Sequence, residues 1–187
     1  SMPLNTTTQP KDIKIIDDFL PKGEFMQLQQ LMCGSEFTWY FIDIINYDWS
    51  EKEKNDPRNF QFVHLLLGKN YESFSTHTKL ILDLFQKRLN AFMFIRIKAN
   101  LNVNSTKIDV YDWHTDYYSE WSKESMSAVF YLNSNDGYTE FQDGTKIESI
   151  ENRIAIFPTM TPHRATNCTN TKSRVVLNFN YFEDTTI

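Results

Sequence analysis

The second half of the sequence is a succession of short segments with strand character, and this pattern limits the fold more than any other feature. Eight such segments are rich in aromatic and β-branched residues: 91–99, 108–113, 125–132, 138–142, 145–150, 153–157, 163–168 and 173–182. Turn residues separate them, as in Asn133-Ser134-Asn135-Asp136-Gly137 and Asp143-Gly144. Many short strands at regular spacing are typical of a β-sandwich or a β-barrel. We therefore expect residues 91–182 to form a mainly β core.

The first half of the sequence differs because it also contains helical patterns. After Pro21, apolar residues recur at helical spacing as far as Gly34, and a second amphipathic helix is predicted over 75–89. Segments 37–45 and 60–67 have strand character. The charged, proline-containing segment between them is predicted to be an exposed loop.

One domain is expected to contain the whole chain, residues 1–187. The length is that of one ordinary domain, and neither an internal repeat nor a change of composition divides the sequence. Residues 1–10 are predicted to be a loose tail, and residues 11–90 a helix-bearing N-terminal half packed on the core of residues 91–182. The expected fold class is mainly β with α+β character.

The charge balance argues against nucleic acid as the main partner. The chain has 19 Lys and Arg against 24 Asp and Glu, a net charge of −5. Phosphate binding grows with the number of paired Lys and Arg side chains, so a protein that depends on it carries a basic excess. A peptide or a small molecule is the favoured partner class.

Cysteine content and hydropathy predict the compartment. Cys33 and Cys168 cannot form a disulfide framework, which is typical of a reducing compartment. The first residues lack the basic and apolar regions of a signal peptide. No segment approaches the ~18 consecutive apolar residues of a membrane span. We expect a soluble, cytoplasmic protein that does not associate with membranes.

Three residues could together hold a metal ion. His114 and Asp116 are two residues apart, and on a strand such residues project to one face. With His163, they would supply the two imidazoles and one carboxylate of the facial triad in non-haem Fe(II) oxygenases. Two structural alternatives stay open, since His114 could simply hydrogen-bond a carboxylate and His163 could be a turn residue after Pro162.

A single arginine in an apolar strand is the candidate anion-binding residue. Arg174 precedes a strand-like run that includes Val175, Val176 and Leu177. Its burial is costly unless an anion accompanies it, and a planar guanidinium can donate two parallel hydrogen bonds to a carboxylate. The alternative is a salt bridge at the rim of a barrel.

The order of these residues resembles that of the 2-oxoglutarate- and Fe(II)-dependent dioxygenases, especially the prolyl 4-hydroxylase-like branch, over about residues 91–182. The run from Tyr111 to Asp116 resembles that branch's Tyr-x-x-His-x-Asp motif. Four other segments are similar to family elements: the tyrosine-bearing strand 130–133, the hairpin 137–141, the strand 152–157 before His163, and 96–101, which is similar to a segment of small bacterial and phage members. That similarity is compatible with a phage- or bacterium-encoded protein, and the sequence leaves the source organism open.

The resemblance implies a double-stranded β-helix, a jelly-roll or cupin-like fold, with Fe(II) and 2-oxoglutarate bound in its mouth. His114, Asp116 and His163 would bind the iron, and no further catalytic residue is implied. Arg174 and Tyr131 would hold the 5-carboxylate of 2-oxoglutarate, and Asn100 and Tyr111 are weaker candidates for the same co-substrate. Dioxygen would be consumed, and the expected outcome is hydroxylation of a peptide or small molecule.

Three departures from the family pattern concern residues around the co-substrate. The first glycine of the family's Gly-Gly pair is Asp136, and the Ser or Thr common two residues after the arginine is Val176. Of the Asn-x-Tyr pair found in some relatives, only Asn100 is kept, because position 102 is Asn. None of these positions is a candidate metal ligand.

Two other functions remain compatible with the sequence. One is a cupin-like metal enzyme without 2-oxoglutarate, in which Arg174 and Tyr131 are merely structural. The other is a noncatalytic jelly-roll binding module, in which the three candidate ligands need not converge. The sequence leaves open the primary substrate, the choice between hydroxylation and demethylation, and the oligomeric state.

Overall fold

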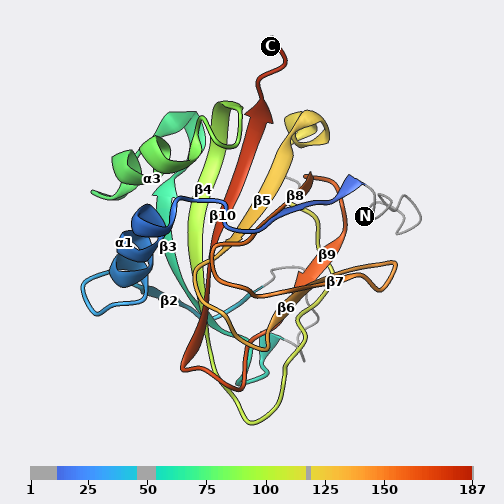
Figure 1. Ribbon diagram of the computed structural model, residues 1–187. Coiled ribbons are helices and arrows are strands. Elements are labelled where there is room, and N and C mark those ends of the chain that lie inside the picture. Colours follow the sequence, from blue (N-terminus) through green and yellow to red (C-terminus); the bar gives the residue numbers. More distant parts are fainter. Residues whose placement is uncertain (1–11, 46–53, 117–118, 187) are drawn as a thin grey trace.

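A computed structural model of the chain describes residues 12–45, 54–116 and 119–186. Within them, the strands form two antiparallel sheets (Figure 1). The larger sheet has the order β1-β8-β5-β10-β4-β3-β2 and the smaller one the order β7-β6-β9. The strands are β1 (Lys14–Ile16), β2 (Tyr40–Ile42), β3 (Gln61–Leu67), β4 (Ala91–Val103), β5 (Met126–Tyr131), β6 (Tyr138–Phe141), β7 (Lys146–Glu148), β8 (Ile154–Pro158), β9 (His163–Ala165) and β10 (Ser173–Glu183).

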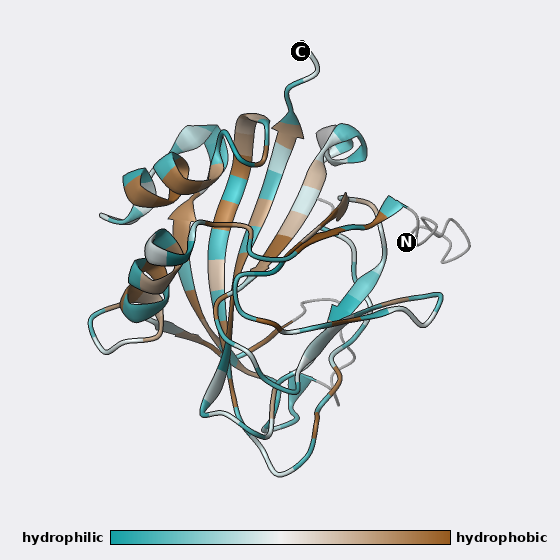
Figure 2. Cartoon of the chain, in the orientation of Figure 1, coloured by the Kyte–Doolittle hydropathy of each residue, from teal (hydrophilic) through white to brown (hydrophobic). Residues whose placement is uncertain are grey.

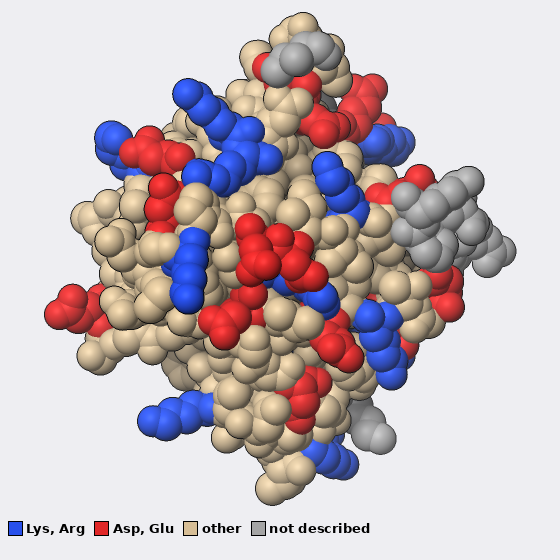
Figure 3. All heavy atoms as spheres, in the orientation of Figure 1, with Lys and Arg blue, Asp and Glu red and all other residues tan. Residues whose placement is uncertain are grey.

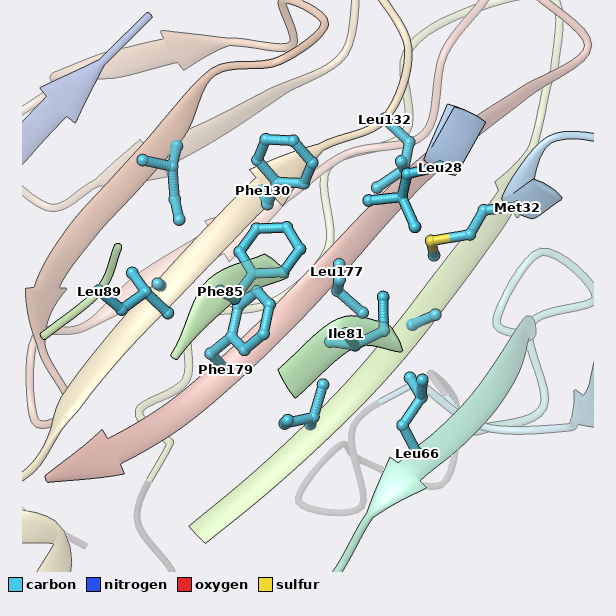
Figure 4. Close-up of a cluster of buried hydrophobic side chains, with 14 of the residues drawn as sticks. Leu28, Met32, Leu66, Ile81, Phe85, Leu89, Phe130, Leu132, Leu177 and Phe179 are labelled. Carbon is cyan, nitrogen blue, oxygen red and sulfur yellow. The ribbon is translucent and has the colours of Figure 1, made fainter. Parts of the chain in front are cut away.

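Two helices cover one face of the larger sheet, α1 (Lys22–Met32) and α3 (Thr78–Phe85) (Figure 1). Their apolar stripes bury side chains against strands β5 and β10 (Figure 4). The ring of Phe85 lies 5.0 Å from that of Phe130 and 4.7 Å from that of Phe179, measured between centroids. Burial of these rings and of the surrounding aliphatic side chains stabilises the layer of helices on the sheet.

The opposite face of the larger sheet meets the smaller sheet. Residues of β5, β8 and β10 pack there against Phe141 of β6 and Ile147 of β7. Side chains alternate across a strand, so β4 and β10 present polar residues to this interior. On β4 these are Arg96, Lys98, Asn100 and Asn102. On β10 the residues opposite them in register are Asn180, Asn178, Val176 and Arg174, of which all but Val176 are polar. Figure 2 shows the resulting alternation of hydrophilic and hydrophobic bands along β4.

The N-terminal half contributes strands as well as helices. β1 pairs with β8, and β3 joins β2 to β4, so both halves of the chain build one sheet. The prediction of helices packed on a β core is correct, but the sheet extends beyond residues 91–182. The predicted tail 1–10 lies outside the described residues, as does most of the predicted loop 46–59.

The strand predicted over 108–113 is wrong. This segment forms one isolated bridge, between Val110 and Thr166, and a second bridge, between His114 and His163, follows just beyond it. The side-chain oxygen of Asn167 accepts a hydrogen bond from the backbone N–H of Asp109 (2.8 Å), where a ladder would use a backbone carbonyl. Such side-chain competition interrupts a regular ladder.

The helix predicted over 75–89 is shorter, because α3 ends at Phe85. Asn90 has a positive φ of 53°, and the N–H of Ala91 bonds the carbonyl of Gln86. This turn leads directly into β4. Leu89 is nevertheless buried, as its apolar spacing indicated.

The surface carries mixed charges. On the face shown in Figure 3, Lys and Arg side chains are interspersed with Asp and Glu. Among the described residues, no helix has the length and apolar character needed to cross a membrane.

Candidate active site

The three candidate metal ligands converge although only one of them lies in a regular strand. His163 begins β9, and a reciprocal pair of backbone hydrogen bonds of 2.9 and 3.0 Å joins it to His114. Residues paired in this way present their side chains on one face, and the two rings lie 4.3 Å apart. The N–H of Asp116 bonds the carbonyl of Thr159, which brings its carboxylate beside both rings. The three side chains therefore converge because the 114–116 segment pairs with residues 159–163 of the same chain, and not because His114 and Asp116 alternate along a strand.

One nitrogen of each imidazole and one carboxylate oxygen face a common point. Asp116 Oδ1 lies 3.7 Å from His114 Nε2 and 3.8 Å from His163 Nε2. The donor atoms of all three residues lie within 4.8 Å of one another. Two imidazoles and a carboxylate on one face are the donor set that suits Fe(II), so the residues present fit such an ion.

The other polar atoms of the triad are held by neighbouring groups. Asp116 Oδ2 accepts hydrogen bonds from Ser127 Oγ (2.8 Å) and Asn180 Nδ2 (3.2 Å), which leaves Oδ1 toward the histidines. His163 Nδ1 lies 2.9 Å from the carbonyl oxygen of Thr161, so this nitrogen can donate and Nε2 can bind a metal. Partners of this kind orient ligands and raise metal affinity.

The electrostatic environment favours the protonation states that ligation requires. Although the His114 side chain is partly exposed, desolvation by the surrounding protein and the neighbouring His163 lower its pKa to about 4, so the imidazole is neutral at physiological pH. Burial alone would raise the pKa of Asp116, but His163, His114 and Arg96 outweigh it and hold the pKa at about 2. Metal ligands must be neutral imidazole and ionised carboxylate.

Arg174 is a fully buried arginine whose contacts are all neutral. Its side chain donates hydrogen bonds to Ser149 Oγ (2.8 Å), Thr139 Oγ1 (3.3 Å) and the carbonyl oxygen of Thr166 (3.3 Å). Among the described residues, no Asp or Glu forms an ion pair with it, and burial lowers its pKa. A buried guanidinium without an anion is costly, so the site is built for an anion that the protein does not itself supply.

Tyr131 lies beside this guanidinium. Its ring centroid is 5.6 Å from Arg174 Cζ, and its hydroxyl is 2.8 Å from Thr139 Oγ1. Val176, two residues after the arginine, is buried against Tyr131 in the apolar cluster between the sheets. At this position the chain thus has an apolar contact where the family pattern has a hydroxyl.

Asn100 and Tyr111 occupy the same interior. Asn100 is opposite Val176 in register, and its buried Oδ1 has no hydrogen-bond partner among the described residues. Tyr111 lies near Asn102 and Arg174, and burial raises the pKa of its hydroxyl. Asn102 lies opposite Arg174, and its Nδ2 has no partner in the described part of the chain. Unpartnered buried polar atoms indicate groups that await a ligand.

Sequence reasoning missed the residues that support the site. Ser127 and Asn180 hold Asp116, while Thr139, Ser149 and Asn102 surround Arg174 and Tyr111. A signal was present in β10, where the polar residues Asn178 and Asn180 share the parity of Arg174 and therefore its face of the strand.

Comparison with known proteins finds a family model that matches the C-terminal part of the chain. The family model described as "2OG-Fe(II) oxygenase superfamily" matches residues 101–182, which include the triad and Arg174. Over these residues, which are less than half of the chain, the protein is similar to that superfamily. Its members use Fe(II) and 2-oxoglutarate, in agreement with the donor set and with the arginine that lacks an anion. The comparison with curated proteins found no match.

Solved structures of such oxygenases share the fold. A prolyl-4-hydroxylase of Pseudomonas putida is 14% identical, with a TM-score of 0.61 over 92% of this chain and 93% of that one. A 2OG-Fe(II) oxygenase family protein of Burkholderia pseudomallei is 11% identical, with a TM-score of 0.65 over 92% and 86%. A prolyl hydroxylase of Trichoplax adhaerens, in complex with a peptide of hypoxia inducible factor, is 15% identical, with a TM-score of 0.59 over 93% and 84%. The predicted double-stranded β-helix is thereby confirmed.

The position of Arg174 depends on a glycine in the turn before β6. A Cβ atom at Gly137 would lie 2.4 Å from the carbonyl oxygen of Asn167 and 2.6 Å from Arg174 Cδ. We expect Gly137→Ala to destabilise the protein by about 1–3 kcal/mol through overpacking and to weaken 2-oxoglutarate binding by displacing Arg174. Thermal unfolding and a 2-oxoglutarate titration measure the two effects.

Gly23→Ala is the matched control, since its Cβ would meet nothing within 4 Å. It should leave 2-oxoglutarate affinity unchanged. Wild-type affinity in Gly137→Ala would show that this turn does not position the arginine.

Proposed function

We propose that the chain is a hydroxylase of the prolyl-hydroxylase-like type, which uses Fe(II), 2-oxoglutarate and dioxygen to hydroxylate a peptide or a small molecule. One observation carries this proposal: a His114–Asp116–His163 set and an arginine without an anionic partner share one interior. When bound, the iron and 2-oxoglutarate supply the oxidising power that places one oxygen atom of dioxygen in a substrate C–H bond, with release of succinate and carbon dioxide.

The chain's own residues would bind and orient these groups. We propose that His114 and His163 bind the metal through Nε2 and that Asp116 binds it through Oδ1, while Ser127 and Asn180 keep the second carboxylate oxygen away from it. Arg174 would pair with the 5-carboxylate of 2-oxoglutarate, and the hydroxyl of Tyr131 would add a hydrogen bond. Asn100 and Tyr111 remain weaker candidates for contact with the co-substrate.

The substrate class is supported by the fold neighbours and by charge. The Trichoplax adhaerens protein binds a peptide, and the net charge of −5 does not favour nucleic acid. Tyr117, Tyr118 and Trp121 follow shortly after Asp116 in the sequence, and because they are aromatic we propose them for the entrance of the site. Tyr117, Tyr118 and the side chain of Trp121 lie outside the described residues. Because β1 to β3 complete the sheet of the C-terminal half, we also propose that the chain folds as one domain.

An anaerobic titration with Fe(II) and 2-oxoglutarate tests the function. Chelation of iron by 2-oxoglutarate gives a weak visible charge-transfer band, which should appear with one equivalent of each. Fe(II) binding without a band that depends on 2-oxoglutarate would favour the cupin-like metal enzyme. Absence of Fe(II) binding would favour the noncatalytic binding module.

A further inference from the structure

The segment that carries His114 is attached to the smaller sheet by isolated bridges and not by a ladder. β9 is the outer strand of that sheet, beyond β6 (Figure 1), and its first residue, His163, forms the bridge with His114. Nearby, the N–H of Tyr111 bonds the carbonyl of Ala165 (2.9 Å). Because few backbone bonds hold this segment, side-chain pairs across it have a large share in fixing its register.

A second set of side chains lies on the other face of the same three segments. Along β6 and β9, Phe141 is opposite His163, and Glu140 is opposite Arg164. Successive residues of a strand point to opposite faces, so Glu140 and Arg164 lie on the face away from the metal triad. Trp113 lies against Arg164 there, with its ring centroid 4.2 Å from the guanidinium carbon.

Trp113, Arg164 and Glu140 thus form a continuous stack across the three segments, which we call the outer clamp. Arg164 Nε donates a hydrogen bond to Glu140 Oε2 (2.7 Å), and the two side chains are only 29% and 12% exposed. The bond holds one edge of the planar guanidinium and leaves its face to stack on the indole. Both the ion pair and the cation–π contact are stronger where water is largely excluded.

Each ligand-bearing end of the bridge is next to one member of the outer clamp. Trp113 precedes His114, and Arg164 follows His163. A contact between Trp113 and Arg164 therefore holds together the two backbones whose imidazole rings lie 4.3 Å apart. Position 113 is unspecified in the Tyr-x-x-His-x-Asp pattern, so that pattern does not account for the contact.

From this arrangement we propose that the outer clamp positions the metal site, because it keeps His114 beside His163 before the metal binds. The proposal rests on the function proposed above. Trp113, Arg164 and Glu140 are positioning residues, since their side chains lie on the opposite face from the triad. Apparent affinity falls with the fraction of molecules that hold the binding-competent arrangement, so loosening the outer clamp should weaken metal binding without removing a donor.

The affinity of the full chain for Mn(II), which takes the place of Fe(II), tests this role without turnover. Electron paramagnetic resonance of the free ion measures the affinity. Trp113→Leu removes the ring and should weaken binding about two- to thirtyfold, the equivalent of a cation–π contact of about 0.5–2 kcal/mol. Trp113→Phe, which keeps an aromatic face, should recover part of that loss.

Variants of the arginine test the same contact from its other side. Arg164→Met should lose at least as much Mn(II) affinity as Trp113→Leu, because it removes both contacts of the stack. Arg164→Lys keeps a cation over the ring and should bind more tightly than Arg164→Met. That comparison decides the matter where Trp113→Leu does not fold.

Two further variants separate positioning from a general loss of stability. The double variant Trp113→Leu/Arg164→Met should bind Mn(II) about as Arg164→Met does, because either change alone breaks the contact. Tyr138→Leu is the matched control. It removes the ring of another cation–π pair of the smaller sheet, in which Lys146 Nζ lies 4.7 Å from the ring centroid, and should leave Mn(II) affinity unchanged.

Three results would overturn the proposal. Folded Trp113→Leu and Arg164→Met could both bind Mn(II) as wild type does, which would make the stack merely structural. Tyr138→Leu could lose as much affinity as Trp113→Leu, or the losses of the two single variants could add in the double variant. Failure of the wild-type protein to bind Mn(II) would contradict the proposed function itself, on which this inference rests.

Discussion

His114→Ala is expected to abolish stoichiometric Fe(II) binding while leaving the protein folded. The imidazole supplies one of three donors, and the side chain is 36% exposed, so little core packing is lost. The backbone bridge to His163 uses no side-chain atom and should persist. Affinity should fall by more than the 10–100-fold that is typical for loss of a residue supporting a ligand. Anaerobic equilibrium binding and circular dichroism measure the two properties.

Three companion variants make this result specific. Asp116→Ala should behave as His114→Ala does. Asn180→Ala removes hydrogen bonds to Asp116 Oδ2 and Ser127 Oγ but no candidate metal donor, and should lose about 10–100-fold in affinity. His77→Ala is the matched control, since its ring packs 5.4 Å from Phe37 outside the triad. Fe(II) bound by His114→Ala as tightly as by wild type would end the facial-triad assignment.

Much of the fold followed from side-chain periodicity, because periodicity is a local property of the chain. The alternation in β4 and β10 and the apolar stripe of α1 are each set within one element. Segment 108–113 shows the limit, since its aromatic and β-branched residues predicted a strand. Whether a ladder forms depends on the partner, and there the side chain of Asn167 binds the backbone of Asp109.

The residues of the candidate site also fall into a group that the sequence predicted and a group that it did not. His114, Asp116, His163 and Arg174 were found through their order in the sequence, whereas their supporting residues come from other elements and meet only in the fold. Ser127 is 11 residues from Asp116, and Asn180 is 64 residues away. Cross-strand register decides such contacts, and the sequence of one strand does not contain it.

Arg174→Ala is expected to cause the largest loss in 2-oxoglutarate affinity. Arg174 is 2% exposed and its guanidinium bonds only neutral groups, so it would form a charge-assisted pair with the 5-carboxylate. Loss of one partner of such a buried pair costs about 2–5 kcal/mol, which is roughly a thirtyfold to several-thousandfold loss in affinity. Iron binding should survive, because the triad does not contact this residue.

Graded variants test the geometry of this pair. Tyr131→Phe removes at most one hydrogen bond to a charged group, about 1.5–3 kcal/mol. Arg174→Lys should recover only part of the affinity, because an ammonium group lacks the planar, two-pronged donor arrangement. Isothermal titration of the Mn(II)-loaded protein ranks the variants.

Arg153→Ala is the matched arginine control. Arg153 already pairs with a protein carboxylate, Asp17, at 2.7 Å, so its loss should leave 2-oxoglutarate affinity unchanged. The contrast also predicts a difference in stability. At a 2-oxoglutarate concentration 100 times the dissociation constant, wild type and Arg153→Ala should each gain about 2.7 kcal/mol against unfolding, and Arg174→Ala should gain far less. Unchanged 2-oxoglutarate affinity in Arg174→Ala would make the arginine structural, and a metal enzyme without 2-oxoglutarate would then be the better assignment.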